Sequence, residues 1–342
     1  MRLTLAINQG HGPTEALLHN HLCFPWHCLT HTIGSAIEYA NMSVATKSTG
    51  QFLHAAKNLQ KETRPLPALE PEDVQVAIRS TTLCGSDLHY YSHFKNGSIL
   101  VREPLCLGHE SAGEIVALGS RVHEANPSLK LGDKVALEVG VPCTKCDLCQ
   151  AGRYNICPEL RFRSSGSKFP HYQGTLQECV NHPAKWATKL PPSLDYEVGA
   201  LLEPLAVAIQ AVHRAERCTY PYSLESVLIF GAGAVGLLTA VAARAAGAEN
   251  IIMADIHQGR LSFAKENGFA SATYSVQPKR AESPDEMIMI AKATAQEIGE
   301  VMWPNGKPVS RVNMVFECTG VSSCVQASVF VSPFSRDLVP MI

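Results

Sequence analysis

Three glycines, at Gly231, Gly233 and Gly236, constrain the fold more than any other feature, because they directly follow an uninterrupted apolar run at residues 227–230. Such a run is typical of a strand buried on both faces of a parallel sheet. After a strand, these glycines permit a tight turn, close approach of the backbone to a pyrophosphate and close packing of the next helix. The positive end of that helix dipole also favours the pyrophosphate. The motif therefore predicts a dinucleotide-binding α/β domain.

An acidic residue follows the glycines at the distance that this kind of site requires. Asp255 ends the next apolar run, residues 251–254, about 20 positions beyond the last glycine. A carboxylate there accepts hydrogen bonds from the adenosine ribose and repels a 2′-phosphate, which favours NAD over NADP. The alternative is that the glycines serve only a strand–helix turn and that Asp255 is a surface residue.

The C-terminal half alternates helical and strand-like segments. A helix is expected over residues 234–246 and a further strand at residues 312–316. Ser283, Pro284 and Glu286 supply the N-cap, first-turn proline and capping-box acid of another helix start. Alternating strands and helices indicate a doubly wound α/β domain with a parallel sheet.

The end of the chain departs from this pattern. A helix is expected at residues 322–330, but residues 331–340 do not have the pattern of the next strand. A complete dinucleotide sheet needs two more strands, roughly 50–60 residues at ~30 per βαβ unit. We therefore expect a truncated cofactor domain and a poor dehydrogenase, arising from a misread splice junction or as a short isoform.

The N-terminal half has the short strands and turns of a β-rich domain. Residues 74–78 alternate between apolar and more polar side chains, which is the period of a half-buried strand. Further strands are expected at residues 114–118 and 134–138, each next to glycine turns. No internal repeat is visible, so we expect one compact β-rich unit.

Three segments are expected along the 342 residues. Residues 1–50 lack a sustained period and are expected to be a disordered extension, with Met42 as a candidate for the true start. Residues 51–205 are expected to form a zinc-binding catalytic domain. Residues 206–342 are expected to form the truncated NAD-binding domain.

Four cysteines lie within fifteen residues, at Cys143, Cys146, Cys149 and Cys157. Zinc binds four thiolates tetrahedrally, and a closed set of four leaves no position for a substrate. The spacing therefore predicts a structural zinc site. The alternative is a redox pair or a group of merely buried cysteines.

Two separate motifs supply a second set of metal ligands. Cys84 begins the first motif, and His109 and Glu110 form the second. A cysteine, a histidine and a glutamate from two loops give three ligands and leave one position open, which is the arrangement of a catalytic zinc. Taken singly, Cys84 or His109 is more often an ordinary core residue.

These motifs together resemble those of the sorbitol and xylitol dehydrogenases of the medium-chain family. The resemblance rests on residues 83–91, 107–113 and 203–205 and on the four-cysteine lobe, and it covers roughly residues 51–328. It implies a GroES-like β-rich catalytic domain and a Rossmann domain. The implied activity is NAD-linked oxidation of a polyol's secondary hydroxyl to a ketose.

The resemblance also implies roles for single residues. Cys84, His109 and Glu110 match the catalytic zinc ligands, Glu203 matches a residue that binds the zinc water or the substrate, and Tyr90 matches a polyol contact. Zinc lowers the pKa of a bound alcohol, while the protein positions the reactants.

A proton relay and the cofactor contacts complete the expected site. Ser86 and His89 are expected to relay the proton outward, with Glu203 and a water as a second route. His89 as a plain surface histidine is the alternative. Besides the three glycines, the expected cofactor contacts are Val235, Asp255 and Arg260.

Composition bounds the partners and the location. The formal net charge of −2 gives no electrostatic case for nucleic acid or an anionic membrane surface. No stretch reaches the ~20 apolar residues of a transmembrane helix, and the N-terminus lacks the pattern of a secretory signal. We expect a cytoplasmic enzyme with a small polyol as its substrate, and a homo-oligomer for a family member of full length.

Two classes of function stay open. The first is a polyol dehydrogenase, and the second is an inactive, truncated zinc-binding product. Within the enzyme class, a simple alcohol or threonine dehydrogenase is the alternative. Glu110 directly after His109, and Glu203 before Pro204, favour polyols because extra polar groups can satisfy a substrate's additional hydroxyls.

Overall fold

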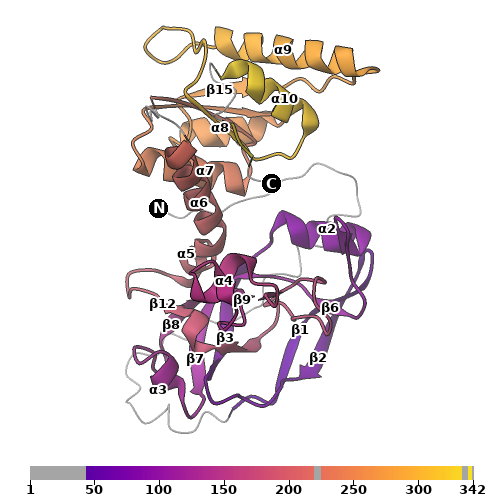
Figure 1. Cartoon of the computed structure of the whole chain (residues 1–342), viewed down its shortest axis with the longest axis vertical. Coiled ribbons are helices and arrows are strands. Elements are labelled where there is room, and N and C mark those ends of the chain that lie inside the picture. Colours follow the sequence, from indigo (N-terminus) through magenta and orange to yellow (C-terminus); the bar gives the residue numbers. More distant parts are fainter. Residues whose placement is uncertain (1–43, 219–224, 333–337, 341–342) are drawn as a thin grey trace. The chain divides into compact units, whose positions relative to one another are not determined.

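The computed structural model describes residues 44–218, 225–332 and 338–340 and contains two five-stranded sheets (Figure 1). The sheet of the N-terminal half is antiparallel, and the sheet of the C-terminal half is parallel. The expected α/β class, a β-rich part followed by a doubly wound part, is confirmed. Among the described helices, none combines the length and apolar character needed to cross a membrane.

The antiparallel sheet contains all three strands expected in this half. In spatial order its strands are β11 (Cys179–Pro183), β3 (Asp73–Thr82), β7 (Glu110–Leu118), β8 (Lys134–Leu137) and β12 (Ala187–Lys189). Val74 and Val76 pack in one hydrophobic core with Ile115, as the alternation predicts.

The other face of β3 differs from the expected half-buried strand. Gln75 is fully buried; its Oε1 accepts a hydrogen bond from the backbone N–H of Ala45 at 2.7 Å, and its Nε2 donates to the Ala45 carbonyl at 2.9 Å. The half-buried period therefore does not hold at Gln75, because the segment around Ala45 covers this side chain and satisfies its buried amide.

A second antiparallel sheet begins before residue 50, where the boundary between the N-terminal extension and the catalytic domain was expected. Its spatial order is β2 (Asn58–Pro65), β1 (Lys47–Ala55) and β6 (Leu105–Cys106). Because β1 begins at Lys47 and pairs with β2 from there, residues 47–50 belong to the sheet and not to a disordered extension. Residues 1–43, with Met42, lie outside the described part of the chain.

Short elements connect these sheets and carry several of the functional side chains. The helices are α2 (Gly85–His93), α3 (Val122–Ala125), α4 (Asp147–Gln150) and α5 (Tyr196–Ala200), and the 3₁₀ turns are η2 (Tyr154–Ile156) and η3 (Ala184–Trp186). Besides β6, the two-residue strands are β4 (Lys95–Asn96), β5 (Ile99–Leu100), β9 (Gly140–Val141) and β10 (Arg161–Phe162).

The parallel sheet has the buried strands that the apolar runs predict. Its spatial order is β15 (Ala272–Ser275), β14 (Asn250–Asp255), β13 (Ser226–Phe230), β16 (Met314–Glu317) and β17 (Leu338–Pro340). The helices of this half are α6 (Leu202–Cys218), α7 (Ala234–Ala245), α8 (Gln258–Glu266), α9 (Pro284–Glu300) and α10 (Ser322–Val331). The boundary expected between residues 205 and 206 therefore falls inside α6.

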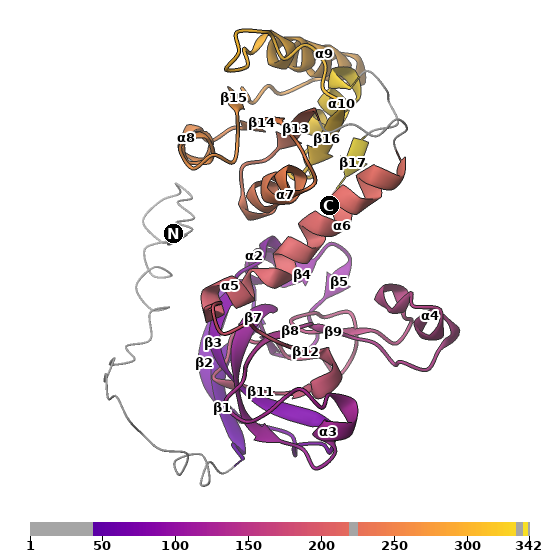
Figure 2. The same ribbon diagram turned by 90° about the vertical axis from the view of Figure 1, so that its left-hand side faces the viewer.

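Helices lie on both sides of the parallel sheet, with α9 and α10 on one side and α7 on the other (Figure 2). Leu228 and Phe230 share one buried cluster with Ile298 of α9 and Ala327 of α10. Side chains along a strand alternate between the two faces, so Val227 and Ile229 point to the opposite face; both are fully buried as well. Burial on both faces is the physical reason why this run is apolar without alternation.

The helix starting at Pro284 confirms the N-cap signal. The Ser283 hydroxyl accepts a hydrogen bond from the Glu286 backbone N–H at 3.2 Å. The Glu286 carboxylate accepts one from the Glu282 backbone N–H at 2.7 Å. The N-cap is thereby confirmed, but Glu286 does not close a capping box, because its carboxylate binds the N–H of the residue before the N-cap and not that of Ser283.

Residues 331–340 contain a strand that the sequence did not predict. Leu338–Pro340 forms β17, which pairs in parallel with β16 in the register Val315 with Leu338 and Glu317 with Pro340. The expectation that this stretch holds no strand was therefore wrong. The edge of β16 offers unpaired backbone groups to any extended segment, and proline is tolerated in an edge strand.

Gly236 should be the least replaceable glycine of the motif. A Cβ built there would lie 1.9 Å from the Gly231 carbonyl oxygen, so helix and strand would have to separate. We expect Gly236→Ala to destabilise the protein by at least about 1–3 kcal/mol, measured by denaturant unfolding.

Gly259→Ala is the matched control, because that helical position has nothing within 4 Å of a new Cβ. It should be neutral or stabilising by up to about 1 kcal/mol. Equal losses in the two variants would contradict the steric argument.

Candidate metal centre and adjoining cavity

The side chains of Cys84, His109 and Glu110 converge, although the two motifs are separate in the sequence. Their ligand atoms all lie within 4.8 Å of one another. Cys84 is the N-cap of α2, and Glu110 begins β7 directly after a turn at Gly108, whose φ is +86°. The end of one strand and the start of another thus bring the three candidate ligands to one place.

The charges of this cluster fit a metal ion. A thiol, an imidazole and a carboxylate form a donor set that suits zinc and leaves one position open. Burial lowers the pKa of His109. The Asp87 carboxylate and the Cys84 thiol have the opposite and larger effect, so the pKa rises to about 11. Burial raises the pKa of Glu110, and a hydrogen bond from Thr82 opposes this. The buried acids therefore require positive charge, and a divalent cation supplies it.

Asp87 belongs to the candidate site, although no sequence motif singled it out. It is 1% exposed, and its Oδ1 accepts hydrogen bonds from the Gly108 backbone N–H at 3.0 Å and the Ser164 hydroxyl at 2.7 Å. Its Oδ2 accepts one from the Cys84 backbone N–H at 3.1 Å and lies 3.5 Å from His109 Nδ1.

A carboxylate behind a histidine ligand is a common way to fix the orientation of the imidazole. His109 Nδ1 is buried, and Asp87 is the polar group placed to satisfy it. The signal in the sequence was the acidic residue at the third position of a helix capped by Cys84, where it closes a capping box.

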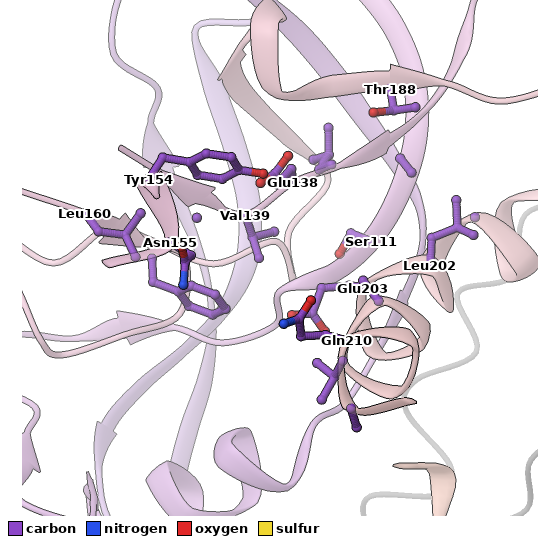
Figure 3. Close-up of a pocket in the computed structure, with 18 of the residues that line it drawn as sticks. Ser111, Glu138, Val139, Tyr154, Asn155, Leu160, Thr188, Leu202, Glu203 and Gln210 are labelled. Atoms are coloured by element: carbon purple, nitrogen blue, oxygen red, sulfur yellow. The ribbon is translucent and has the colours of Figure 1, made fainter. Parts of the chain in front are cut away.

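A cavity of about 690 Å³ adjoins the cluster and is shown in Figure 3. Ser111, the residue after Glu110, lines it, as does Glu203 in the first turn of α6. In Figure 3, Glu203 and Gln210 project from α6, and the Tyr154 hydroxyl points toward Glu138. Polar groups therefore stand at several points of an otherwise largely apolar wall.

The carboxyl group of Glu203 has a pKa near neutral pH. Burial raises its pKa to about 7, the charge of His109 lowers it, and Glu110 raises it. The metal cluster is thus close enough to influence this carboxyl group. A group with a pKa near 7 suits proton exchange at physiological pH.

Three predicted residues do not join the cluster. Tyr90 is 2% exposed in a hydrophobic core, where its hydroxyl accepts a hydrogen bond from the Gly166 backbone N–H at 3.2 Å, and it is not among the residues that line the cavity. His89 is exposed, and Ser86 is half-buried. In the part of the chain that is described, neither makes a hydrogen bond to the cluster.

The four cysteines of the lobe also converge. Their sulfur atoms lie within 4.8 Å of one another, with Cys146 3.5 Å from Cys149 and 3.9 Å from Cys157. All four are free thiols. Zinc–sulfur bonds of ~2.3 Å place tetrahedral sulfur atoms about 3.8 Å apart, so the spacing suits a zinc ion better than disulfides. Hydrogen bonds from the Lys145 and Cys146 backbone N–H groups lower the pKa of Cys143 to about 6.

The glycine motif and Asp255 meet at the carboxyl ends of β13 and β14. Gly231 has a φ of +96°, which favours glycine. Asp255 is buried; its carboxylate accepts hydrogen bonds from the backbone N–H groups of Ala232 at 2.7 Å and His257 at 2.8 Å. Arg260 Nη1 lies 3.9 Å from the same carboxylate. Val235, half-buried, is in the first turn of α7.

Two family models match the chain. The model described as "Alcohol dehydrogenase GroES-like domain" matches residues 70–192, and that described as "Zinc-binding dehydrogenase" matches residues 234–332. Among curated relatives, a Neosartorya fischeri protein named "Probable D-xylulose reductase A" is 39% identical over 259 residues, which are 75% of this chain and 68% of that protein.

Solved structures agree with this likeness. A Sinorhizobium meliloti protein described as a zinc-binding dehydrogenase and bound to NADP superposes with a TM-score of 0.69 and 28% identity, over 87% of this chain and 77% of that one. L-idonate 5-dehydrogenase of Escherichia coli superposes with a TM-score of 0.66 and 28% identity, over 84% of this chain and 73% of that one.

The two metal sites should be separable by substitution. We expect Cys146→Ser to remove one zinc and to loosen the lobe, because structural zinc contributes directly to folding. His109→Ala should remove the other zinc and leave the fold largely intact. Metal analysis and thermal unfolding of the two variants and the wild type measure both effects. Loss of both metals in each variant would contradict two independent sites.

Glu203 should make stability depend on pH in zinc-stripped protein. Its folded pKa of about 7 exceeds its usual value of 4.5, so folding is penalised increasingly as pH rises between these values, and fully above them. Glu203→Gln removes the penalty. We expect a variant more stable than wild type by on the order of 2 kcal/mol at about pH 8, and a much smaller difference at about pH 5.

The control for this experiment is Glu266→Gln, because Glu266 is exposed at the end of α8. Its stability difference from wild type should not change with pH. Parallel pH profiles for the two variants would show that burial of Glu203 is not the cause.

Proposed function

The chain belongs to the zinc-binding dehydrogenase family with a GroES-like domain, and from this premise we propose that it oxidises a secondary hydroxyl of a small polyol, such as xylitol or sorbitol, to a ketose with NAD. The observation that carries the proposal is the convergence of Cys84, His109 and Glu110 beside a cavity lined by Glu203. The relative named "Probable D-xylulose reductase A" supports the same class of substrate.

We propose that Cys84, His109 and Glu110 hold a catalytic zinc and that the four-cysteine lobe holds a structural one. The chemistry that zinc and NAD supply when bound is Lewis-acid activation of the alcohol and acceptance of a hydride. Glu203, with a pKa near 7, takes up or releases the hydroxyl proton. The proton relay through Ser86 and His89 on α2 stays a prediction, because neither makes a hydrogen bond to the cluster among the described residues.

The cavity wall favours a substrate with several hydroxyls. Glu138, Asn155 and Gln210 line it and offer hydrogen-bond donors and acceptors along its length. A site built to bind hydroxyls discriminates against substrates that lack them, because its own polar groups would then stay unpaired. The position of Tyr90 in the core speaks against the polyol contact that the sequence analysis assigned to it.

The cofactor would bind at the carboxyl ends of β13 and β14. Gly231, Gly233 and Gly236 allow the backbone to approach the pyrophosphate, and the Asp255 carboxylate disfavours a 2′-phosphate. Val235 and Arg260 are proposed as additional contacts. The assignment of one domain to catalysis and the other to the cofactor, the cytoplasmic location and a homo-oligomer stay predictions.

The test is an assay of NAD and NADP reduction by the zinc-loaded 342-residue chain with xylitol, sorbitol, ethanol and threonine. We expect a kcat/KM for the polyols at least about tenfold above that for ethanol or threonine, and a preference for NAD. Asp255→Ser should reduce the preference for NAD, since the 2′-phosphate would no longer face a carboxylate.

Glu249→Ser is the control, because Glu249 is exposed directly before β14, and it should leave the cofactor preference unchanged. A wild type that prefers NADP would refute the role of Asp255. A better rate with ethanol or threonine than with either polyol would refute the substrate class.

A further inference from the structure

The segment that leaves the four-cysteine lobe reaches the candidate metal centre. It runs from Cys157 through β10 to Ser164. The Phe162 ring meets the His109 ring edge-on, with ring centroids 5.3 Å apart and an interplanar angle of 64°. Two residues later, the buried Ser164 hydroxyl donates its hydrogen bond to Asp87. The same short segment therefore contacts a proposed ligand and the carboxylate behind that ligand.

Between these two contacts, Arg163 anchors the segment. It is 3% exposed, and its guanidinium donates to the carbonyl oxygens of Gln173 and Asn181 and to His182 Nδ1. Burial lowers the pKa of His182 to about 3, and the positive charge of Arg163 lowers it as well. The neutral ring therefore accepts at Nδ1 and donates at Nε2 to the Trp186 carbonyl, 3.1 Å away. This network leaves the backbone at Ser164 little freedom.

We infer that Ser164 is a positioning residue of the metal centre, which holds the Asp87 carboxylate so that Asp87 orients His109. The inference rests on the proposed zinc site. Asp87 Oδ1 has two donors, the Gly108 backbone N–H and the Ser164 hydroxyl. Only the second comes from outside the two segments that carry the ligands. Without it, the carboxylate can rotate away from His109 Nδ1.

The expected consequence is faster loss of zinc from this centre alone. Removing a group that orients a histidine ligand typically weakens metal binding ~10–100-fold. Ser164 acts on His109 indirectly, through Asp87. We therefore expect Ser164→Ala to raise the rate of zinc release to a chelator about tenfold, at the lower end of this range. The phase of release that belongs to the centre is the one absent from His109→Ala protein.

Two further variants separate positioning from general damage. Ser164 has a φ of +60°, a conformation that glycine adopts freely, so Ser164→Gly removes the hydroxyl with less risk to folding. Ser167→Ala is the matched control, because Ser167 is exposed and its hydroxyl accepts a hydrogen bond from Ser165 of the same loop at 3.1 Å. The glycine variant should release zinc as fast as Ser164→Ala, and the control as slowly as wild type.

A double-mutant cycle tests whether Ser164 acts through Asp87. In an Asp87→Asn background, Ser164→Ala should leave the release rate unchanged. An undiminished effect in that background would overturn the inference, as would equal acceleration of release from the four-cysteine lobe. If both Ser164 variants released zinc at the wild-type rate, the positioning role of Ser164 would be overturned while the proposed function stayed intact. If wild-type protein showed no phase of zinc release that depends on His109, both the positioning role and the proposed function would be overturned.

Discussion

The buried carboxylate of Asp87 is the interaction on which the candidate site depends. It accepts hydrogen bonds from the backbone N–H groups of Cys84 and Gly108, and thereby ties together the two segments that carry the proposed ligands. A buried carboxylate without such donors would be costly. Burial raises the pKa of Asp87, but the hydrogen bond and charge of His109, together with hydrogen bonds from Ser164 and Gly108, lower it below its usual value. One side chain thus fixes both the geometry and the charge of the centre.

The same charge constraint extends outward to the cavity. Glu110 and Glu203 both have raised pKa values, mainly because they are buried. Several acids around one histidine are compatible with folding only where a cation or protons compensate them. The chemistry proposed for the enzyme and the stability of this region therefore share one physical cause, the need to neutralise buried negative charge.

In the cofactor half, the main constraint is steric: backbone segments must approach one another, and a phosphate, closely. Gly236 lies so near the Gly231 carbonyl that no side chain fits. The Asp255 carboxylate accepts a hydrogen bond from the Ala232 backbone N–H, so the residue proposed to select the cofactor also shapes the loop that would hold its pyrophosphate. Loop geometry and cofactor preference are coupled through this contact.

Local features of the sequence determined much of this protein: the buried runs of the parallel sheet, the capping of α9 by Ser283, the glycine turn and the types of the metal ligands. These depend on neighbouring residues and on the periods of strand and helix. Tertiary structure alone decided that β17 pairs with β16, that Gln75 is covered, that Tyr90 faces the core and that Ser164 reaches Asp87 across 77 positions. Such contacts join segments distant in the sequence, and no local pattern encodes which distant donor meets a buried acceptor.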